Sequence, residues 1–316
     1  MKILVTIHPF GISREETQKS LQGFDVIYNE KGRKYTGDEL KDILQKINPD
    51  IIIAGTEKYS ADILDLCPNL KMISRAGVGV DAIDLMECHK RKIIVTYTPD
   101  VASHAVAELT IGQMLNCLRF VQKASGQWQR LIGKSIKDCV VGVFGYGRIG
   151  KEVVKKLQSL EPQKILINDI NNLTLLDLPQ ANLATKEEII RNSDIITFHI
   201  PLIEPALFPA YNNQNFFAAE ELLKLKSDSI IINTSRGGII NESDLFDWLS
   251  CHPEGRAAVD VFCEEPYAGA LRNLDNAYLT PHIGSCTEKC RYDMEVGAVK
   301  EVLAFTGGGE FVNRLV

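Results

Sequence analysis

Short apolar runs alternate with amphipathic segments along most of the chain. In the first hundred residues, four such runs predict strands at 3–7, 50–54, 71–74 and 93–96. Helical periodicity or capping residues mark the segments between them, as at 36–47 and 61–67. The runs are continuously apolar, which is typical of parallel strands covered on both faces. The pattern predicts a first α/β unit that ends near Thr98 and Pro99, because proline disfavours helix in the residue before it.

The longest helical pattern, at 101–120, is apolar on most faces and predicts a helix buried inside the protein or partly against a second subunit. A second series of strands and helices follows it, with strands predicted at 140–144, 165–168, 195–199, 229–233, 257–262 and 277–280. Six such strands with intervening helices are typical of a doubly wound nucleotide-binding domain. A last helix at 287–305 has no strand of this series left to cover, so we expect it to return to the first unit.

Composition excludes several classes of partner. The formal net charge of −6 and the sequence pI of about 5.6 provide no bulk attraction to nucleic acid or to an anionic membrane. The N-terminal apolar stretch is too short for a signal peptide, and no run approaches the roughly 18 apolar residues of a membrane helix. The eight cysteines form no Cys-x-x-Cys pair, so we expect buried free thiols in a reducing cytoplasm. Cys286 and Cys290 have helical spacing, but no further ligands accompany them and no metal site is predicted.

A G-x-G-x-x-G motif occupies residues 145–150. The hexapeptide alone is a weak signal, but here it follows a predicted strand and opens a helix at 151–160. Gly145 allows a tight turn, Gly147 lets the backbone approach a pyrophosphate, and Gly150 lets the helix pack on the strand. The N–H groups of the helix start would bind the phosphates. The context therefore predicts a dinucleotide site.

Asp169 ends the next predicted strand and is the candidate for the cofactor ribose. A carboxylate there accepts hydrogen bonds from both ribose hydroxyls and repels a 2′-phosphate. Residues 170–172 contain neither Arg nor Lys, which favours NAD over NADP. The alternative interpretation is a solvated turn aspartate.

Three chemically suited residues follow three predicted strands of the second series. They are Arg236 after 229–233, Glu265 after 257–262 and His282 after 277–280. Doubly wound folds bind ligands outside the carboxyl ends of their strands. A histidine can protonate a ketone oxygen, a carboxylate can hold its imidazolium, and arginine can grip a 2-oxo acid.

Each of the three also has a structural alternative. His282 could belong to a turn, and Arg236 could bond only backbone carbonyls. Glu264 is a competing carboxylate that spacing alone does not exclude.

Seven stretches together resemble the D-isomer-specific 2-hydroxyacid dehydrogenase family over essentially the whole chain. They are SRAGVGVDAIDL (74–85), TPDVASHAVAEL (98–109), GYGRIGKEV (145–153), HIPL (199–202), NTSRGGIINESDL (233–245), AAVDVFCEEP (257–266) and TPHIG (280–284). The resemblance implies Arg236, Glu265 and His282 as the catalytic residues, with Glu265 chosen because it directly precedes a proline. It implies two doubly wound parallel-sheet domains: a flavodoxin-like substrate-binding domain (1–98 and 285–316) and a Rossmann NAD-binding domain (99–284).

The resemblance also implies binding residues. Val78 and Gly79 would offer backbone N–H groups to the substrate carboxylate, beside Arg236, and Asp260 would lie near the nicotinamide. Arg75 is a candidate for a substrate phosphate, with a structural salt bridge as the alternative. The residues implied around NAD are Gly145, Gly147, Arg148, Ile149, Gly150, Asp169, His199, Pro201, Thr234, Ser235, Arg236, Asp260, His282 and Gly284.

Within the family, the stretches SRAGVGVD, DVFCEEP and PHIGSCTEK look most like D-3-phosphoglycerate dehydrogenase. We therefore predict hydride transfer between NAD and C2 of a D-2-hydroxy or 2-oxo acid, with D-3-phosphoglycerate as the leading substrate. The alternatives are a glyoxylate, hydroxypyruvate or other D-2-hydroxyacid reductase and, in another class, an NAD-sensing protein like the corepressors built on this scaffold. A cytoplasmic homodimer is expected.

Several positions depart from the family pattern. Tyr97, Lys92 and Ile203 replace the usual asparagine, glycine and threonine, and the segment 203–217, predicted as a surface loop or lid, is longer than usual.

Overall fold

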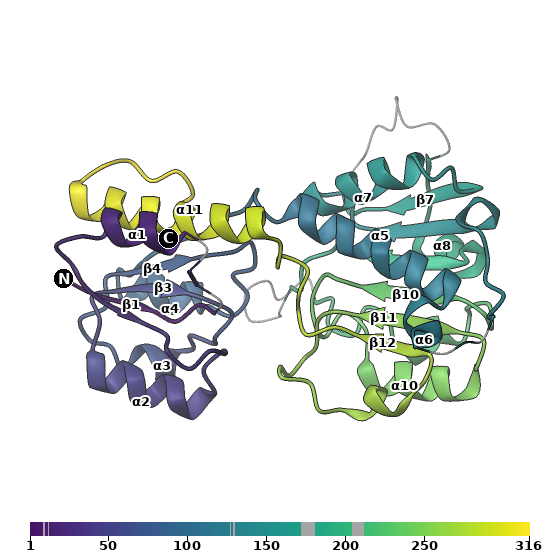
Figure 1. Cartoon of the computed structure of the whole chain (residues 1–316), viewed down its shortest axis with the longest axis horizontal. Helices are drawn as coiled ribbons and strands as arrows, with labels where there is room; N and C mark the ends of the chain where they lie inside the picture. Colours follow the sequence, from purple (N-terminus) through teal and green to yellow (C-terminus); the bar gives the residue numbers. More distant parts are fainter. Residues whose placement is uncertain (9, 12, 127, 129, 172–180, 204–211) are drawn as a thin grey trace. The chain divides into compact units, whose positions relative to one another are not determined.

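Parallel strands with helices on both faces make up each part of the chain (Figure 1). The computed structural model describes residues 1–8, 10–11, 13–126, 128, 130–171, 181–203 and 212–316. The chain divides into unit 1, Met1–Ala102 with Cys286–Val316, and unit 2, Ser103–Ser285. Residues 204–211 of the predicted surface loop lie outside the described residues.

Unit 1 contains a five-stranded parallel sheet in the flavodoxin-like order β2-β1-β3-β4-β5. The strands are β1 (Lys2–Val5), β2 (Asp25–Tyr28), β3 (Ile51–Ala54), β4 (Met72–Arg75) and β5 (Ile94–Thr96). The prediction of four strands omitted β2. This strand lies at the edge of the sheet and is only partly buried, so it lacks the continuous apolar run that marks the others.

Helices cover both faces of this sheet (Figure 1). They are α1 (Arg14–Ser20), α2 (Gly37–Ile47), α3 (Ala61–Leu64), α4 (Leu85–Lys90) and α11 (Glu288–Gly307). The C-terminal helix α11 packs on β3, β4 and α1, and the Ser74 hydroxyl donates to the Ala298 carbonyl oxygen at 2.9 Å. On the other face, Leu44 of α2 and Ile63 of α3 share one apolar core with Ile52 of β3.

Unit 2 contains a seven-stranded parallel sheet in the order β12-β11-β10-β9-β6-β7-β8. The strands are β6 (Val140–Phe144), β7 (Lys164–Asn168), β8 (Ala181–Leu183), β9 (Ile195–Phe198), β10 (Ile230–Asn233), β11 (Arg256–Val259) and β12 (Ala277–Leu279). The prediction of six strands was therefore one short. The strand that was not predicted, β8, is a three-residue edge strand with two exposed residues, so it has no apolar run by which it could be recognised.

Two helical layers cover this second sheet. The helices are α5 (Ser103–Arg119), α6 (Val121–Ala124), α7 (Arg148–Gln158), α8 (Lys186–Asn192), α9 (Ala219–Leu222) and α10 (Glu242–Cys251). Helices α5 and α7 pack against each other and share one apolar core with the sheet, and α8, α9 and α10 share a second core on the other face. None of the described helices combines the length and apolar character that a membrane span requires.

Candidate active site

The turn between β6 and α7 has the geometry of a dinucleotide-binding turn. Gly145 has φ +93°, and a Cβ atom there would lie 2.5 Å from the His199 carbonyl oxygen. At Gly150, a Cβ atom would lie 2.0 Å from the Gly145 carbonyl oxygen, so helix α7 packs directly on the turn. At Gly147, a Cβ atom would meet nothing within 4 Å. Space is therefore kept open at the N-terminus of α7, where the positive end of the helix favours a phosphate.

His199 lies beside this turn as a buried, neutral imidazole. Its Nε2 is 3.0 Å from the Thr197 hydroxyl oxygen, and burial lowers the pKa of His199 to about 3. Its Nδ1 is buried and has no hydrogen-bond partner among the described residues. A buried ring nitrogen without a partner is costly in a native protein and fits a site completed by a ligand.

Asp169 closes the turn from the end of β7. Its Oδ2 accepts a hydrogen bond from the Tyr146 N–H at 2.7 Å, and its Oδ1 accepts from the backbone and side chain of Asn171 at 2.8 and 2.9 Å. Partial burial acts to raise the pKa of Asp169, but the bonds from Tyr146 and Asn171 outweigh it and lower the pKa. The carboxylate is thus ionised, as a ribose-binding acid requires. The contact with Tyr146 was not predicted.

The turns that carry Arg236, Glu265 and His282 follow three neighbouring strands. Asn233 of β10 is paired with Val259 of β11, which is paired with Leu279 of β12. The three strands therefore end level with one another at the carboxyl edge of the sheet.

The first two of these turns are in direct contact. A Cβ atom at Gly237 would lie 2.1 Å from the carbonyl carbon of Phe262, so the turn that carries Arg236 packs on the backbone that leads to Glu265. Arg236 donates from Nη1 to the Ser235 carbonyl oxygen at 2.7 Å.

Glu265 and His282 form a close pair. The imidazole Nδ1 lies 3.0 Å from Oε1 and 2.9 Å from Oε2 of Glu265. The Phe262 N–H also donates to Oε1 at 3.2 Å, which holds the carboxylate in place. The side chains are 34% exposed for His282 and 21% exposed for Glu265, so a small molecule can reach them. His282 has φ 53°, a left-handed conformation that non-glycine residues adopt rarely and that clusters at functional sites.

Asp260 supports the turn that holds His282. Its Oδ1 accepts from the Thr280 hydroxyl at 2.6 Å and from the Ile283 N–H at 2.9 Å, and its Oδ2 accepts from the Gly284 N–H at 2.8 Å. These bonds fix the backbone on both sides of His282. Burial raises the pKa of Asp260, although the bonds from Thr280 and the turn oppose the rise. The sequence did not predict that Asp260 supports this turn or that the Thr280 hydroxyl donates a hydrogen bond to it.

The other residues predicted around NAD lie at the same edge of the unit 2 sheet. Arg148 and Ile149 start α7, Pro201 follows β9, and Gly284 lies in the Asp260-bound turn. Thr234 and Ser235, which directly follow β10, are held by contacts of their hydroxyl groups. The Thr234 hydroxyl is 2.8 Å from the Thr110 hydroxyl of α5, and the Ser235 hydroxyl donates to Asn233 Oδ1 at 2.8 Å.

The predicted substrate residues Arg75, Val78 and Gly79 belong to unit 1. Arg75 is buried and donates from Nε to the Gly79 carbonyl oxygen at 3.0 Å and from Nη1 to the Ala76 carbonyl oxygen. Gly77, with φ +148°, leaves the room that this guanidinium occupies. Arg75 therefore shapes the turn that presents the Val78 and Gly79 backbone.

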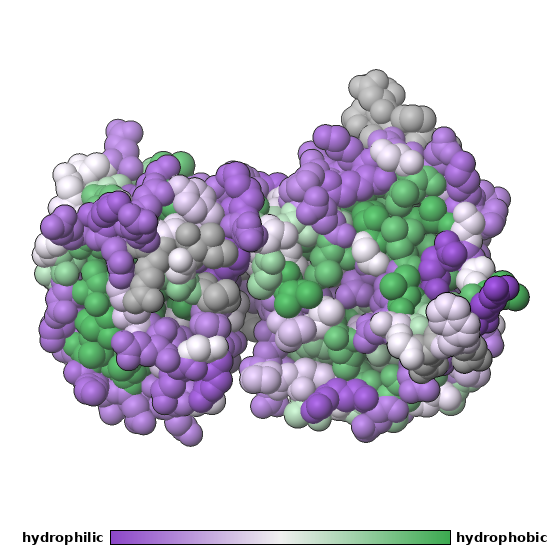
Figure 2. Space-filling model, in the orientation of Figure 1, coloured by the Kyte–Doolittle hydropathy of each residue, from purple (hydrophilic) through white to green (hydrophobic). Residues whose placement is uncertain are grey.

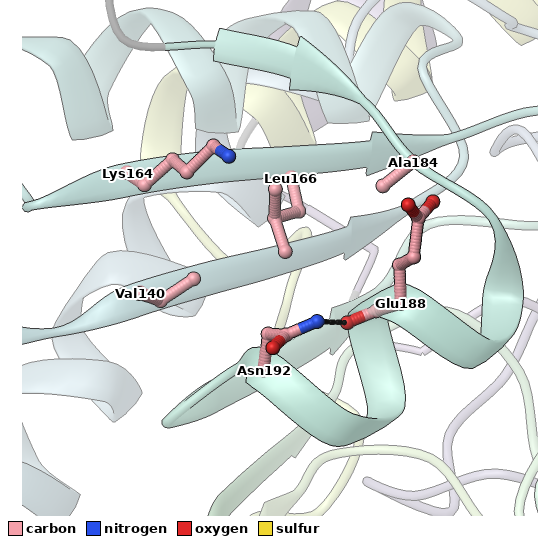
Figure 3. A pocket seen from close by; sticks show the side chains of 6 residues that line it. All are labelled: Val140, Lys164, Leu166, Ala184, Glu188 and Asn192. Atoms are coloured by element: carbon pink, nitrogen blue, oxygen red, sulfur yellow. Dashed lines mark hydrogen bonds between the residues drawn. The ribbon is translucent and has the colours of Figure 1, made fainter.

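A separate pocket lies between the sheet and helix α8 (Figure 3). Its lining residues are Val140, Lys164, Leu166, Ala184, Glu188 and Asn192. Val140 and Lys164 begin β6 and β7, whereas the residues described above follow carboxyl ends of strands. Glu188 forms the capping box of α8 with Thr185, and Asn192 donates to the Glu188 carbonyl oxygen at 2.7 Å. These contacts stabilise helix α8, and we assign no chemistry to this pocket.

Comparison with known proteins shows the family of the chain. Residues 111–284 match the family model described as D-isomer specific 2-hydroxyacid dehydrogenase, NAD binding domain. The hydroxypyruvate reductase of Thermotoga maritima is 32% identical over 297 residues, which cover 89% of this chain and 94% of that protein. The D-3-phosphoglycerate dehydrogenase of Methanocaldococcus jannaschii is 34% identical over 284 residues, which cover 81% of this chain and 50% of that protein. The solved TT0316 protein from Thermus thermophilus is 27% identical, with both chains fully covered and a TM-score of 0.85.

The chain belongs to the D-isomer-specific 2-hydroxyacid dehydrogenase family. It is an NAD-dependent oxidoreductase of the D-2-hydroxyacid type. The predicted family, fold class and cofactor are thereby confirmed.

Asp169→Ala is expected to weaken discrimination against NADP by about tenfold or more, because the carboxylate that repels a 2′-phosphate is gone. The measurement is kcat/KM for NADH and NADPH with one 2-oxo acid. Asp275→Ala, an exposed aspartate before β12, is the control and should leave the ratio unchanged. An unaltered ratio in Asp169→Ala would contradict the ribose contact.

Proposed function

We propose that this chain catalyses reversible hydride transfer between NAD and C2 of a small D-2-hydroxy acid, with Arg236, Glu265 and His282 as the catalytic residues. The Glu265–His282 pair at the carboxyl edge of the unit 2 sheet is the observation that carries the proposal. In this proposal, unit 2 binds NAD and unit 1 contributes the substrate-binding turn at Val78 and Gly79.

His282 is the proton donor in the direction of reduction. NADH, when bound, supplies the hydride, and negative charge develops on the substrate carbonyl oxygen. Because Glu265 engages Nδ1, Nε2 is the nitrogen that delivers the proton. The carboxylate stabilises the imidazolium before transfer and keeps the ring in one orientation. In the oxidation direction the same Nε2 accepts the hydroxyl proton.

Arg236 orients the substrate. Its guanidinium carries donors in a planar fork that matches the carboxylate and carbonyl oxygens of a 2-oxo acid. The bond from Nη1 to Ser235 fixes the plane of the guanidinium, and the contact of Gly237 with Phe262 fixes the turn. The N–H groups of Val78 and Gly79 add donors for the substrate carboxylate.

For the substrate, we propose a small 2-oxo acid without a phosphate, such as hydroxypyruvate or glyoxylate. Arg75, the candidate phosphate ligand, is buried and bonded to the carbonyl oxygens of Ala76 and Gly79. The near full-length similarity to a hydroxypyruvate reductase supports the same class. D-3-phosphoglycerate remains the second candidate, because a D-3-phosphoglycerate dehydrogenase is 34% identical over 284 residues.

The experiment is NADH oxidation with glyoxylate, hydroxypyruvate, pyruvate and 3-phosphohydroxypyruvate in turn. We expect the highest kcat/KM with hydroxypyruvate or glyoxylate. Preference for 3-phosphohydroxypyruvate would favour the second candidate. Tight NADH binding with no turnover of any of the four acids would overturn the catalytic proposal and favour an NAD-sensing protein.

We also propose a homodimer formed through the region around α5 and α6. Large apolar side chains are exposed there, namely Leu115, Val121, Trp128 and Ile132, and Figure 2 shows apolar surface on this face of unit 2. Exposed apolar patches of this kind mark interfaces. The double variant Trp128→Glu, Ile132→Glu is expected to sediment as a monomer. The control Val312→Glu, an exposed valine of unit 1, should sediment like the wild type. A wild-type monomer would contradict the proposal.

A further inference from the structure

Glu242, the first residue of helix α10, contacts the segment of unit 2 that leads to Glu265. Its Oε1 accepts a hydrogen bond from the Cys263 N–H at 2.8 Å. The preceding residue, Asn241, is the N-cap of α10, and its side chain accepts from two N–H groups of the first turn. The helix start is therefore capped without Glu242, and the Glu242 carboxylate is used instead to hold a neighbouring stretch of backbone.

The stretch 238–241, which leads into α10, is anchored on its other side. The Phe217 N–H donates to the Ile239 carbonyl oxygen at 3.0 Å, and the Asn241 N–H donates to the Phe217 carbonyl oxygen at 2.9 Å. Two backbone bonds to one residue hold this stretch directly before the helix. Glu242 therefore extends from a fixed support, which is what a side chain needs in order to position another group.

The consecutive N–H groups of Phe262 and Cys263 are held by two different carboxylates. The Phe262 N–H donates to Glu265 Oε1 at 3.2 Å, and the Cys263 N–H donates to Glu242 Oε1 at 2.8 Å. Because a peptide group is planar, the first bond orients the peptide plane before Phe262 and the second orients the plane after it. The bond to Glu242 thus helps to fix the N–H donor that keeps the Glu265 carboxylate in place beside His282.

The Cys263 side chain adds a second contact between the same elements. Its Sγ lies 3.7 Å from the position that a Cβ atom would take at Gly238, just after Arg236. Partial burial and the adjacent Glu242 carboxylate raise the pKa of the Cys263 thiol to about 11, so the thiol is protonated at neutral pH and donates to Glu242. The turn that carries Arg236, the start of α10 and the segment that carries Glu265 therefore meet at Cys263.

We propose that Glu242 is a positioning residue for the reaction and that it acts through Glu265. By holding the Cys263 N–H, it fixes the segment that orients the Glu265 carboxylate toward His282. The inference rests on the proposed function, because it takes Glu265 and His282 to be the pair that transfers the proton. Without the Glu242 carboxylate, Glu265 is held less firmly, so the imidazolium is less stabilised and the proton donor is less well oriented.

Glu242→Ala is expected to lower kcat for 2-oxo acid reduction by about tenfold, because shifts of about 1 Å in a catalytic group cost up to on the order of 10²-fold in rate. The dissociation constant for NADH, from a fluorescence titration, should stay at the wild-type value, since the turn at 145–150 is untouched. On the alkaline side, the pH at which kcat falls to half its maximum should move down by about half a unit or more, because reduction needs the imidazolium that Glu265 stabilises. Asp260, the other carboxylate close to His282, keeps its bonds to the turn in this variant.

Glu242→Gln tests the hydrogen bond itself. The amide carbonyl can accept from the Cys263 N–H as the carboxylate does, so kcat should stay within about threefold of the wild type and the pH profile should not move. A loss as large as that of Glu242→Ala would contradict the role of this bond. Glu188→Ala is the matched control, since Glu188 Oε2 also accepts a backbone N–H at a helix start, from Thr185 at 2.8 Å, and α8 packs on β6 and β7, away from β10, β11 and β12. It should lose stability with unchanged kcat and pH profile.

Glu242→Asp covers the case in which Glu242→Ala does not fold. The aspartate keeps a negative charge at the N-terminus of α10, where the helix dipole favours it. Its carboxylate is one methylene shorter and no longer reaches the Cys263 N–H. We expect the same direction of change in kcat and in the pH profile as for Glu242→Ala, with a melting temperature close to that of the wild type.

Glu265→Gln separates this inference from the proposed function. If Glu242 acts through Glu265, adding Glu242→Asp to Glu265→Gln should lower kcat by less than about twofold more. Wild-type turnover in Glu265→Gln would overturn the proposed function and this inference with it. A loss in Glu265→Gln, with unchanged kcat and pH profile in Glu242→Ala and Glu242→Asp, would overturn only the role of Glu242. A further tenfold loss in the double variant would show that Glu242 does not act through Glu265 and would also overturn the inference.

Discussion

His282→Ala is expected to lower kcat for 2-oxo acid reduction by about 10²- to 10⁴-fold, the usual contribution of a positioned general acid. The alanine variant cannot deliver a proton to the developing alkoxide, and Glu265 loses the imidazole that it holds at 2.9 and 3.0 Å. NADH affinity should change little, because the turn at 145–150 and Asp169 are untouched. Steady-state kcat and a fluorescence titration with NADH separate the two effects.

His252→Ala is the control for this substitution. His252 caps the end of α10, before β11, and its ring stacks on Trp248 at the opposite edge of the same sheet. We expect kcat in this variant to stay within about threefold of the wild type. If His282→Ala retained comparable turnover, the proton-donor role of His282 would be refuted.

Gly237→Ala is expected to be the most damaging of the small substitutions. The new methyl group would lie 2.1 Å from the Phe262 carbonyl carbon and 2.2 Å from its oxygen, so the turn that carries Arg236 must move away from the segment leading to Glu265. Shifts of about 1 Å in a catalytic group cost on the order of 10²-fold in rate. Overpacking of this kind also destabilises a fold by about 1–3 kcal/mol. kcat/KM and a thermal melt measure the two losses.

Gly112→Ala provides the matched control for Gly237→Ala. Gly112 lies within helix α5, and a Cβ atom there would meet nothing within 4 Å. Alanine favours helix over glycine by up to about 1 kcal/mol, so this variant should melt slightly higher than the wild type with unchanged kcat. Wild-type activity and stability in Gly237→Ala would show that the contact between the two turns is not required.

The sequence determined the fold class, and it predicted that the candidate catalytic residues follow the carboxyl ends of strands in the second series. Interior parallel strands are buried on both faces, so β3, β6, β9 and β10 are continuous apolar runs that can be recognised without a structure. The glycine motif was convincing because a strand precedes it and a helix follows it. The sequence pattern did not predict the edge strands β2 and β8, because each is short and partly exposed and so has no continuous apolar run. Pairing with a neighbouring strand, and not local composition, makes each of them a strand.

The tertiary structure decided how these residues act on one another. Spacing along the chain does not exclude Glu264, and only the structure shows that Glu265 contacts His282. Asp260 supports the His282 turn through contacts between strand ends that lie far apart in the sequence. The sequence leaves Arg75 open as a phosphate ligand or a structural residue, and only the structure shows its bonds to the carbonyl oxygens of Ala76 and Gly79. A motif specifies which side chains are present, whereas strand register and burial determine which of their atoms meet.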